Sequence, residues 1–176
     1  SIIDILNCRC ILDYMHKKVL AEQALYHGDV KMPAGWEINQ EQFTSDILES
    51  KYSRSEFKFS KNYDRLNNFV TEHLNMKFDL RLCQKETWGN IYKPKQTTKQ
   101  MLEADLMNLR ASADFVLLYG VKVKDCTVHI SYDNNRVKDK TWSIPLTNNK
   151  FLVFPATNTY YIENNQTDSL NFIHVT

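Results

Sequence analysis

The chain has 176 residues, 43% of them hydrophobic and 12% aromatic, which is enough to bury a core and argues against intrinsic disorder. Lys and Arg number 22 against 21 Asp and Glu, a net charge of +1, whereas a general polyanion binder needs a basic excess or a segregated basic face. No apolar run approaches the ~18 residues of a membrane span, and residues 1–4 lack the basic start of a signal peptide. We therefore expect one structural unit with no membrane partner, no nucleic-acid partner and no secretion through a recognisable signal.

The first part of the chain has the spacing of helices. Residues 2–25 are predicted to be largely helical, and residues 26–59 to be irregular apart from a short helix at 40–49. From residue 60 onward one apolar stripe follows the 3.6-residue period, with Ser60 as its N-cap. The stripe consists of Tyr63, Leu66, Phe69, Val70, His73 and Leu74. We expect a helical N-terminal region over residues 1–79.

After residue 80 the hydrophobic period shifts towards two, which is typical of strands. The strands are expected at about 80–92, 114–124, 126–132, 140–146, 150–154, 158–163 and 169–175. The stretch 97–112 fits either a helical turn or two or a crossing from one strand to another. Turns rich in Asn and Asp separate the strands, including 133–135, 147–149 and 163–165. The predicted class is α+β, with N-terminal helices packed on an antiparallel β-roll over residues 80–176.

Three segments of the β half resemble one family. They are 86–92 (ETWGNIY), 113–123 (ADFVLLYGVKV) and 142–165, which contains the sequences KFLVFP and YYIENN. In this order they resemble the 2-oxoglutarate/Fe(II)-dependent oxygenases, especially the short members encoded by marine tailed phages. The resemblance covers roughly residues 56–176 and implies a double-stranded β-helix, or jelly-roll, barrel.

The resemblance also implies where a metal site would lie. Such a site needs a His-x-Asp or His-x-His pair and a distal His on one octahedral face, and a basic residue pairs with the far carboxylate of 2-oxoglutarate. The corresponding positions in this chain are Asn108, Arg110, Tyr160 (or Tyr161 with a one-residue slip) and Leu170. An amide, a permanent cation, a phenol and an aliphatic side chain do not suit these roles. We therefore expect no metal, no cofactor and no catalytic residue at these positions, so the chain is predicted to be a pseudoenzyme.

Other residues offer alternative ligand sets. One set is His129, Asp133 and His174, because residues 129 and 133 share one face of a predicted strand. His27 and Asp29 form a His-x-Asp pattern, but they precede the predicted barrel, so a surface turn is favoured there.

Two further groups of residues are candidates for a binding site. Glu103 and Asp105 suit Mg²⁺ or Ca²⁺ better than Fe(II) if their loop points inward, although a solvated helix face is the favoured interpretation. Lys93, Lys95 and Lys99 form a small basic cluster, for which a solvated loop is favoured.

The favoured hypothesis is a catalytically degenerate oxygenase-like protein that acts as a structural or protein-binding subunit. The phage-type resemblance places it in a virion or in the host cytoplasm, in contact with virion proteins or copies of itself as a homo- or hetero-oligomer. One alternative is an active hydroxylase with displaced ligands that binds Fe(II) and 2-oxoglutarate. Another is a glycan- or peptide-binding jelly roll with an open groove and stacked aromatic side chains.

Overall fold

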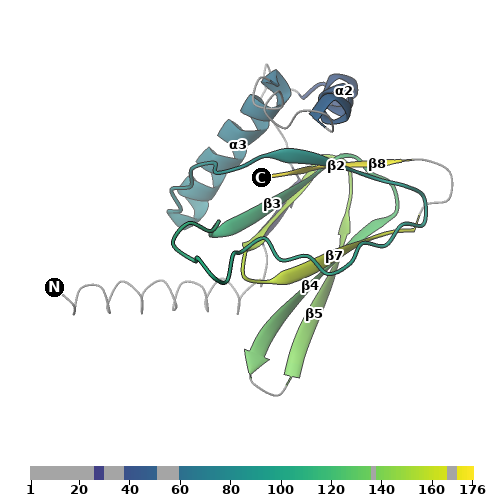
Figure 1. The fold of residues 1–176 in the computed structure, drawn as a ribbon. Coiled ribbons are helices and arrows are strands. Elements are labelled where there is room, and N and C mark those ends of the chain that lie inside the picture. Colours follow the sequence, from purple (N-terminus) through teal and green to yellow (C-terminus); the bar gives the residue numbers. More distant parts are fainter. Residues whose placement is uncertain (1–25, 30–37, 51–59, 136–137, 166–169) are drawn as a thin grey trace.

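The computed structural model describes residues 26–29, 38–50, 60–135, 138–165 and 170–176 (Figure 1). The helices and strands within these ranges are β1 (Tyr26–Asp29), α2 (Gln40–Ser50), α3 (Lys61–Phe78), β2 (Trp88–Tyr92), β3 (Phe115–Lys122), β4 (Cys126–Asn135), β5 (Lys138–Leu146), β6 (Lys150–Pro155), β7 (Thr159–Asn164) and β8 (Asn171–Val175). The helix predicted over 2–25 lies outside the described residues. Neither described helix has a stretch both long and apolar enough to cross a membrane.

The strands form two antiparallel sheets. The larger sheet has the order β1-β6-β3-β8-β2, and the smaller has the order β5-β4-β7. Strands that are neighbours in a sheet are mostly distant in sequence, which is the topology of a rolled sheet rather than of a meander. The inner faces of both sheets pack on each other through one apolar cluster that includes Val116, Leu118, Val128 and Ile130.

The helices α2 and α3 cover the outer face of the larger sheet (Figure 1). Side chains of β3 alternate between the two cores: Val116 and Leu118 face the smaller sheet, whereas Leu117 and Tyr119 face the helices. The helix-side core includes Phe43 of α2, whose ring stacks on that of Tyr119 with centroids 6.1 Å apart. The helices therefore pack on the β-roll, as the sequence predicted.

Helix α3 begins where the capping pattern predicted. The Ser60 hydroxyl accepts a hydrogen bond from the Tyr63 amide at 3.2 Å, which satisfies one of the free N–H groups of the first turn. The predicted stripe is buried at Tyr63, Leu66, Val70 and Leu74. The helix ends at Asp79, which adopts a left-handed backbone with φ 55°.

The stretch 97–112 is a crossing between strands, so the second of the two predicted alternatives is confirmed. It runs beside β7 and is held there by isolated bridges from Thr97 to Glu163 and from Met101 to Tyr160. Met101 and Tyr160 exchange backbone hydrogen bonds of 2.7 and 3.0 Å. The crossing therefore occupies the position of a fourth strand in the smaller sheet.

Four expectations differ from the structure. Residues 133–135, expected in a turn, form the end of β4 and pair with β5. Residues 26–29 form the edge strand β1 rather than irregular chain, because they pair with β6 from Tyr26 to Asp29. Strand β2 begins at Trp88 rather than near residue 80, and the residues before it have no ladder partner within the described chain. Asn164 ends β7 as a fully buried residue instead of lying in an exposed turn, and its amide donates to the Lys93 carbonyl at 2.7 Å. The domain boundary near residue 80 stays a prediction.

The β5 edge of the smaller sheet has no ladder partner among the described residues, and we call it the open edge. Successive residues of a strand point their backbone N–H and C=O groups to opposite neighbours. Tyr160 and Ile162 of β7 bond to the crossing, so Tyr161 between them bonds to β4, where its partner is His129. His129 therefore points its backbone groups to β7 and not to β5. Ser143, its partner on β5, consequently points its own N–H and C=O groups away from β4. Pro145 has the same parity as Ser143, so its missing N–H falls on the open edge and costs no ladder hydrogen bond.

Candidate functional site

The crossing brings a carboxylate to a buried phenol at one end of the roll. Tyr160 is 1% exposed, and its hydroxyl donates a hydrogen bond to Oε1 of Glu103 at 2.7 Å. The ring of Phe154 packs against that of Tyr160 at a centroid distance of 5.2 Å. The pKa of Tyr160 is raised, first by burial and then by the hydrogen bond to Glu103 and the charge of that carboxylate. Tyr160 is therefore a neutral hydrogen-bond donor over the physiological pH range.

The neighbouring polar groups of the interior are also held in their neutral forms. Burial raises the pKa of Tyr92, whose hydroxyl oxygen accepts a hydrogen bond from the Asn90 amide at 3.1 Å. Burial, assisted by the charges of Asp125 and Glu163, raises the pKa of the Cys126 thiol to about 12. A thiol with so high a pKa is a poor nucleophile near neutral pH.

The residues that hydrogen-bond to Tyr160 are not at the other ligand positions that the family resemblance indicated. Asn108 and Arg110 are exposed and lie in the turns that follow the crossing. Met101 and Glu103 lie beside Tyr160 instead, the first through backbone hydrogen bonds and the second through its carboxylate. The residues of this stretch that contact Tyr160 are therefore Met101 and Glu103.

The remaining candidate ligands belong to separate sheets. His129 and Asp133 lie on β4 of the smaller sheet, whereas the backbone of His174 lies on β8 of the larger sheet, in register with Gly89 and Tyr119. The side chains of Asp133 and His174 lie outside the described part of the chain. Leu170 is 40% exposed just before β8.

Other candidates have local structural partners. His27 and Asp29 lie on β1, and their side chains are outside the described part. Asp105 is exposed, and its Oδ1 accepts a hydrogen bond from the Met107 amide at 3.0 Å, which closes a local turn. Among the described residues, no group of three His, Cys, Asp or Glu side chains is arranged to hold a metal ion. The lysines at 93, 95 and 99 are exposed.

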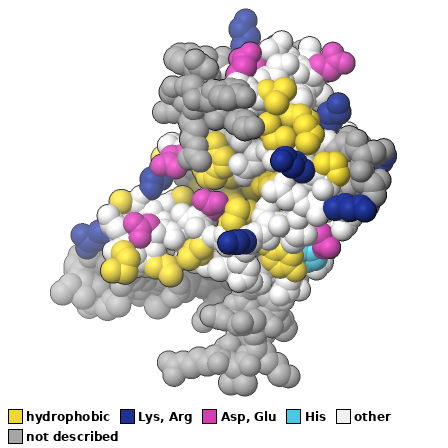
Figure 2. Space-filling view, turned by 45° about the vertical axis from the view of Figure 1, so that its right-hand side comes forward, with side chains coloured by type: hydrophobic (Ala, Val, Ile, Leu, Met, Phe, Trp, Pro, Cys, Tyr) yellow, Lys and Arg dark blue, Asp and Glu magenta, His cyan; other side chains and the backbone are white. Residues whose placement is uncertain are grey.

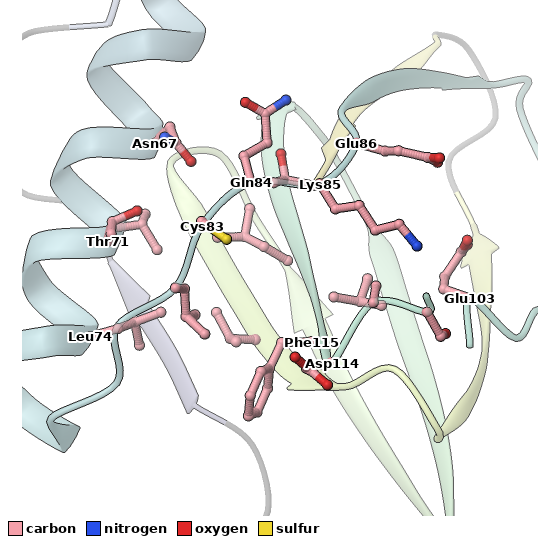
Figure 3. Close-up of a pocket in the computed structure, with 18 of the residues that line it drawn as sticks. Asn67, Thr71, Leu74, Cys83, Gln84, Lys85, Glu86, Glu103, Asp114 and Phe115 are labelled. Atoms are coloured by element: carbon pink, nitrogen blue, oxygen red, sulfur yellow. The ribbon is translucent and has the colours of Figure 1, made fainter. Parts of the chain in front are cut away.

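A cavity of about 590 Å³ lies between α3, the segment before β2 and the start of β3 (Figure 3). Its walls combine apolar side chains with charged ones of both signs. The apolar wall includes Leu66, Val70, Leu74, Leu82, Phe115 and Leu117, and the charged residues are Arg81, Lys85, Glu86, Glu103, Asp105, Arg110 and Asp114. Figure 3 shows Asn67, Thr71 and Leu74 on the α3 side, with Glu103 at the opposite side. Glu103 therefore connects the buried end of the roll with this cavity.

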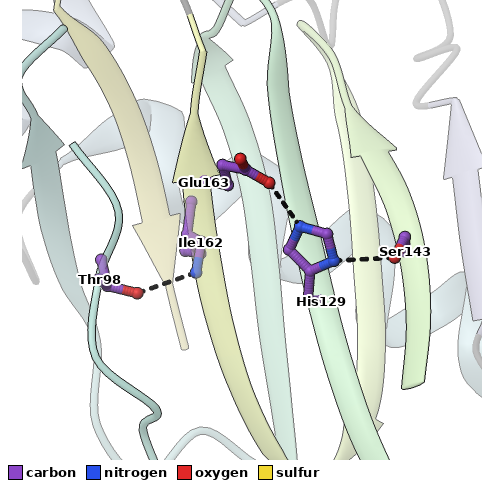
Figure 4. Close-up of polar contacts among 5 residues, drawn as sticks. All are labelled: Thr98, His129, Ser143, Ile162 and Glu163. Carbon is purple, nitrogen blue, oxygen red and sulfur yellow. Dashed lines mark hydrogen bonds and ion pairs between the residues drawn. The ribbon is translucent and has the colours of Figure 1, made fainter. Parts of the chain in front are cut away.

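A second polar cluster lies on the outer face of the smaller sheet (Figure 4). Nδ1 of His129 lies 2.8 Å from the Ser143 hydroxyl, and Nε2 lies 2.8 Å from Oε2 of Glu163. The imidazole stacks on the ring of Tyr161 at 4.5 Å and 18°. Sequence reasoning selected His129 but missed these partners, although Ser143 and Glu163 alternate with inward-facing apolar residues in their own strands.

Comparisons with known proteins identify the fold. No family model matches the sequence, and no curated protein matches it significantly. Among solved structures, the epimerase SnoN from nogalamycin biosynthesis, a non-heme alpha-ketoglutarate-dependent enzyme, has a TM-score of 0.65 at 9% identity, over 95% of this chain and 81% of SnoN. A prolyl hydroxylase from Trichoplax adhaerens, in complex with a peptide of the hypoxia inducible factor oxygen degradation domain, has a TM-score of 0.61 at 11% identity, over 97% of this chain and 90% of that one. A prolyl-4-hydroxylase from Pseudomonas putida has a TM-score of 0.58 at 9% identity, over 90% and 86% of the two chains.

These similarities define the class of fold. The chain is an α+β protein whose helices pack on an antiparallel double-stranded β-helix, and this is the fold of 2-oxoglutarate/Fe(II)-dependent oxygenases. The predicted fold class is therefore confirmed. At 9 to 11% identity the similarity concerns the fold alone, because one fold serves many functions.

Proposed function

We propose that this chain has an oxygenase fold that is degenerate at the metal site and acts as a protein-binding subunit of an assembly. The observation that carries the proposal is the contact between Tyr160 and Glu103. Tyr160 occupies the position that the family resemblance gives to the distal metal ligand, and it is buried, protonated and bonded to the adjacent carboxylate.

The donor set at this end of the roll does not fit Fe(II). A neutral phenol is a poor ligand for Fe(II), and the side chain of Met101 is a thioether, which suits softer metals. Glu103 is the carboxylate that contacts Tyr160, and its Oε1 already accepts the phenol proton. The described side chains at this position therefore supply one hard ligand where the family chemistry needs three.

The cavity supports binding of a protein segment. An apolar wall bordered by charges of both signs suits an extended segment with apolar side chains and a few charged ones, because each charge can find an opposite partner. On the face in Figure 2, charged side chains of both signs surround the hydrophobic ones. Exposed apolar residues adjoin the cavity wall, with Leu106 63%, Met107 96% and Leu109 59% exposed.

The assembly partner is proposed to be a copy of this chain or a neighbouring phage-particle protein. Support comes from the exposed apolar group of Leu106, Met107 and Leu109, since such patches often mark interaction surfaces. The resemblance of segments 86–92, 113–123 and 142–165 to short phage-encoded proteins supports the phage context.

Metal analysis and oligomeric mass together test this function. The purified protein, incubated anaerobically with Fe(II) and then supplied with 2-oxoglutarate and oxygen, is expected to retain no stoichiometric iron and to form no succinate above a protein-free control. Stoichiometric iron with succinate formation would contradict the proposal and support the active hydroxylase.

The assembly is measured by light scattering after size exclusion. We expect a defined oligomer for the wild type, and dissociation to smaller species in a variant with Leu106→Asp and Met107→Asp. Met76→Asp is the matched control, because Met76 is 86% exposed but lies on α3. A wild-type monomer, or equal masses for all three proteins, would contradict assembly of copies through this patch. A monomer would direct the search to a phage-particle protein.

A further inference from the structure

We propose that Ser143, His129 and Glu163 form a nucleophilic site on the outer face of the smaller sheet, which transfers the acyl group of an activated ester first to Ser143 and then to water. The three residues come from β5, β4 and β7, so the sheet register itself brings them together. None of them lines the cavity next to α3. This site is therefore separate from the end of the roll that contains Tyr160.

The hydrogen-bond chemistry of the cluster assigns the proton of each group. An ionised carboxylate only accepts hydrogen bonds, so a neutral His129 bonded to Glu163 carries its proton on Nε2. Nδ1 then has a free lone pair, and the Ser143 hydroxyl, 2.8 Å away, donates to it. The hydroxyl proton is thus already directed at a general base, which is the relation that activates a serine nucleophile.

The position of the imidazole is fixed by its neighbours. Tyr161 packs parallel to the ring of His129, and Glu163 bonds its far nitrogen. The side chain of His129 is 15% exposed and that of Glu163 is 40% exposed, whereas Ser143 is exposed. The base is therefore held in one orientation while the nucleophile remains accessible to a substrate. Glu163 is a positioning residue, because it acts through His129.

The backbone supplies a donor for the oxygen that becomes negatively charged. The alternation of the ladder directs the Ser143 N–H towards the sheet edge that no described strand covers. An N–H next to the attacking oxygen can stabilise the oxyanion of a tetrahedral intermediate, and one such donor contributes about 10²–10³ in rate. Because the site lies on an open sheet face, it favours an activated ester whose acyl group lies along the surface.

The proposed reaction balances without a cofactor. Oγ of Ser143 bonds to the acyl carbon as Nδ1 of His129 takes the hydroxyl proton. The bond from the acyl carbon to the leaving alcohol oxygen then breaks, and the imidazolium returns the proton to that oxygen. Water repeats both steps, which releases the carboxylic acid and restores the Ser143 hydroxyl.

Two probes test the nucleophile: hydrolysis of p-nitrophenyl acetate, and labelling by a fluorophosphonate located by peptide mass spectrometry. We expect the wild type to be labelled on Ser143 and Ser143→Ala to lose that label. His129→Gln is expected to slow labelling by about 10²-fold or more, because general base catalysis contributes 10²–10⁴. Ser131→Ala is the matched control, because Ser131 lies on the same face but faces the Thr141 hydroxyl at 3.4 Å instead of an imidazole. Equal labelling of wild type and His129→Gln, no label on Ser143, or a label only on other residues would overturn the proposal.

The role of Glu163 is tested by a spectroscopic readout. The ¹⁵N chemical shifts of the His129 ring distinguish its two tautomers, and the wild type is expected to carry the proton on Nε2. Glu163→Gln is expected to lower that population and slow labelling about 10-fold, at the low end of base-catalysis effects, and Glu163→Asp to restore part of both. An unchanged tautomer and rate in Glu163→Gln would remove Glu163 from the site.

Discussion

Strands β4 and β7 present two different surfaces, and the difference shows which groups of this fold remain available for chemistry. Their inner faces bury Tyr160 and Ile130 among apolar side chains, where the carboxylate of Glu103 is bonded to the Tyr160 phenol. Their outer faces leave His129 and Glu163 partly exposed, bonded to each other and to Ser143. The described inward-facing side chains of these two strands pack as a core, whereas His129 and Glu163 on the outer face are accessible to solvent.

The largest effect is expected at Tyr160. Tyr160→Ala should lower the free energy of unfolding by about 3–5 kcal/mol, because it removes a buried aromatic ring and leaves Glu103 without its donor. Tyr160→Phe should cost less, about 1–3 kcal/mol, because it removes only the hydroxyl and keeps the ring. Urea denaturation followed by circular dichroism measures both values. A loss below about 1 kcal/mol for Tyr160→Ala would contradict a packed interior at this position.

The two faces of β4 provide a comparison within one strand. Ile130→Ala should cost about 2–5 kcal/mol, since Ile130 is 0% exposed and its loss leaves a cavity between the sheets. Ser131→Ala, one residue further along on the outer face, should change stability by no more than about 0.5 kcal/mol. Equal losses in the same denaturation assay would show that the outer face is also part of a buried contact.

Much of this arrangement is readable from the sequence, but the partners across strands are not. The cap and stripe of α3 and the alternation of the strands depend on residues close in sequence, so the helix and most strands were predicted. Glu103 lies beside Tyr160 because of the register of the crossing against β7. The sequence of the crossing has no hydrophobic period from which that register could be predicted. The partners of His129 lie 14 and 34 residues away, so only the paired sheet brings them together.

The stability of the protein is expected to fall at alkaline pH because buried groups are kept protonated in the folded state. The folded protein raises the pKa of Cys126 from 9.0 to about 12, so between these values the unfolded chain binds fewer protons than the folded one. Stability is therefore fully present below pH 9 and falls as the pH rises towards 12, by up to ~1.4 kcal/mol per pH unit for this group. Tyr63, whose pKa rises from 10.0 to about 12, adds to the fall above pH 10.

The measurement is the free energy of unfolding between pH 8 and 11 for the wild type and Cys126→Ala. We expect the variant to be less stable at pH 8 and to lose less stability between pH 9 and 10 than the wild type. Cys83→Ala is the control, because Cys83 is an exposed free thiol and should leave the slope unchanged. Parallel pH profiles for the wild type and Cys126→Ala would show that the thiol is not kept protonated by the fold.

The smallest stability effect is expected at Ser143, where the proposed chemistry is greatest. Ser143→Ala should change the free energy of unfolding by no more than about 0.5 kcal/mol, because the side chain is exposed and its hydrogen bond to His129 is exchangeable with water. Denaturation of this variant beside Tyr160→Ala measures the difference directly. A large loss at Ser143 would mean that the cluster is a structural clamp of the three strands. If Ser143→Ala abolishes the fluorophosphonate label but barely changes the free energy of unfolding, then Ser143 is needed for reactivity and not for folding.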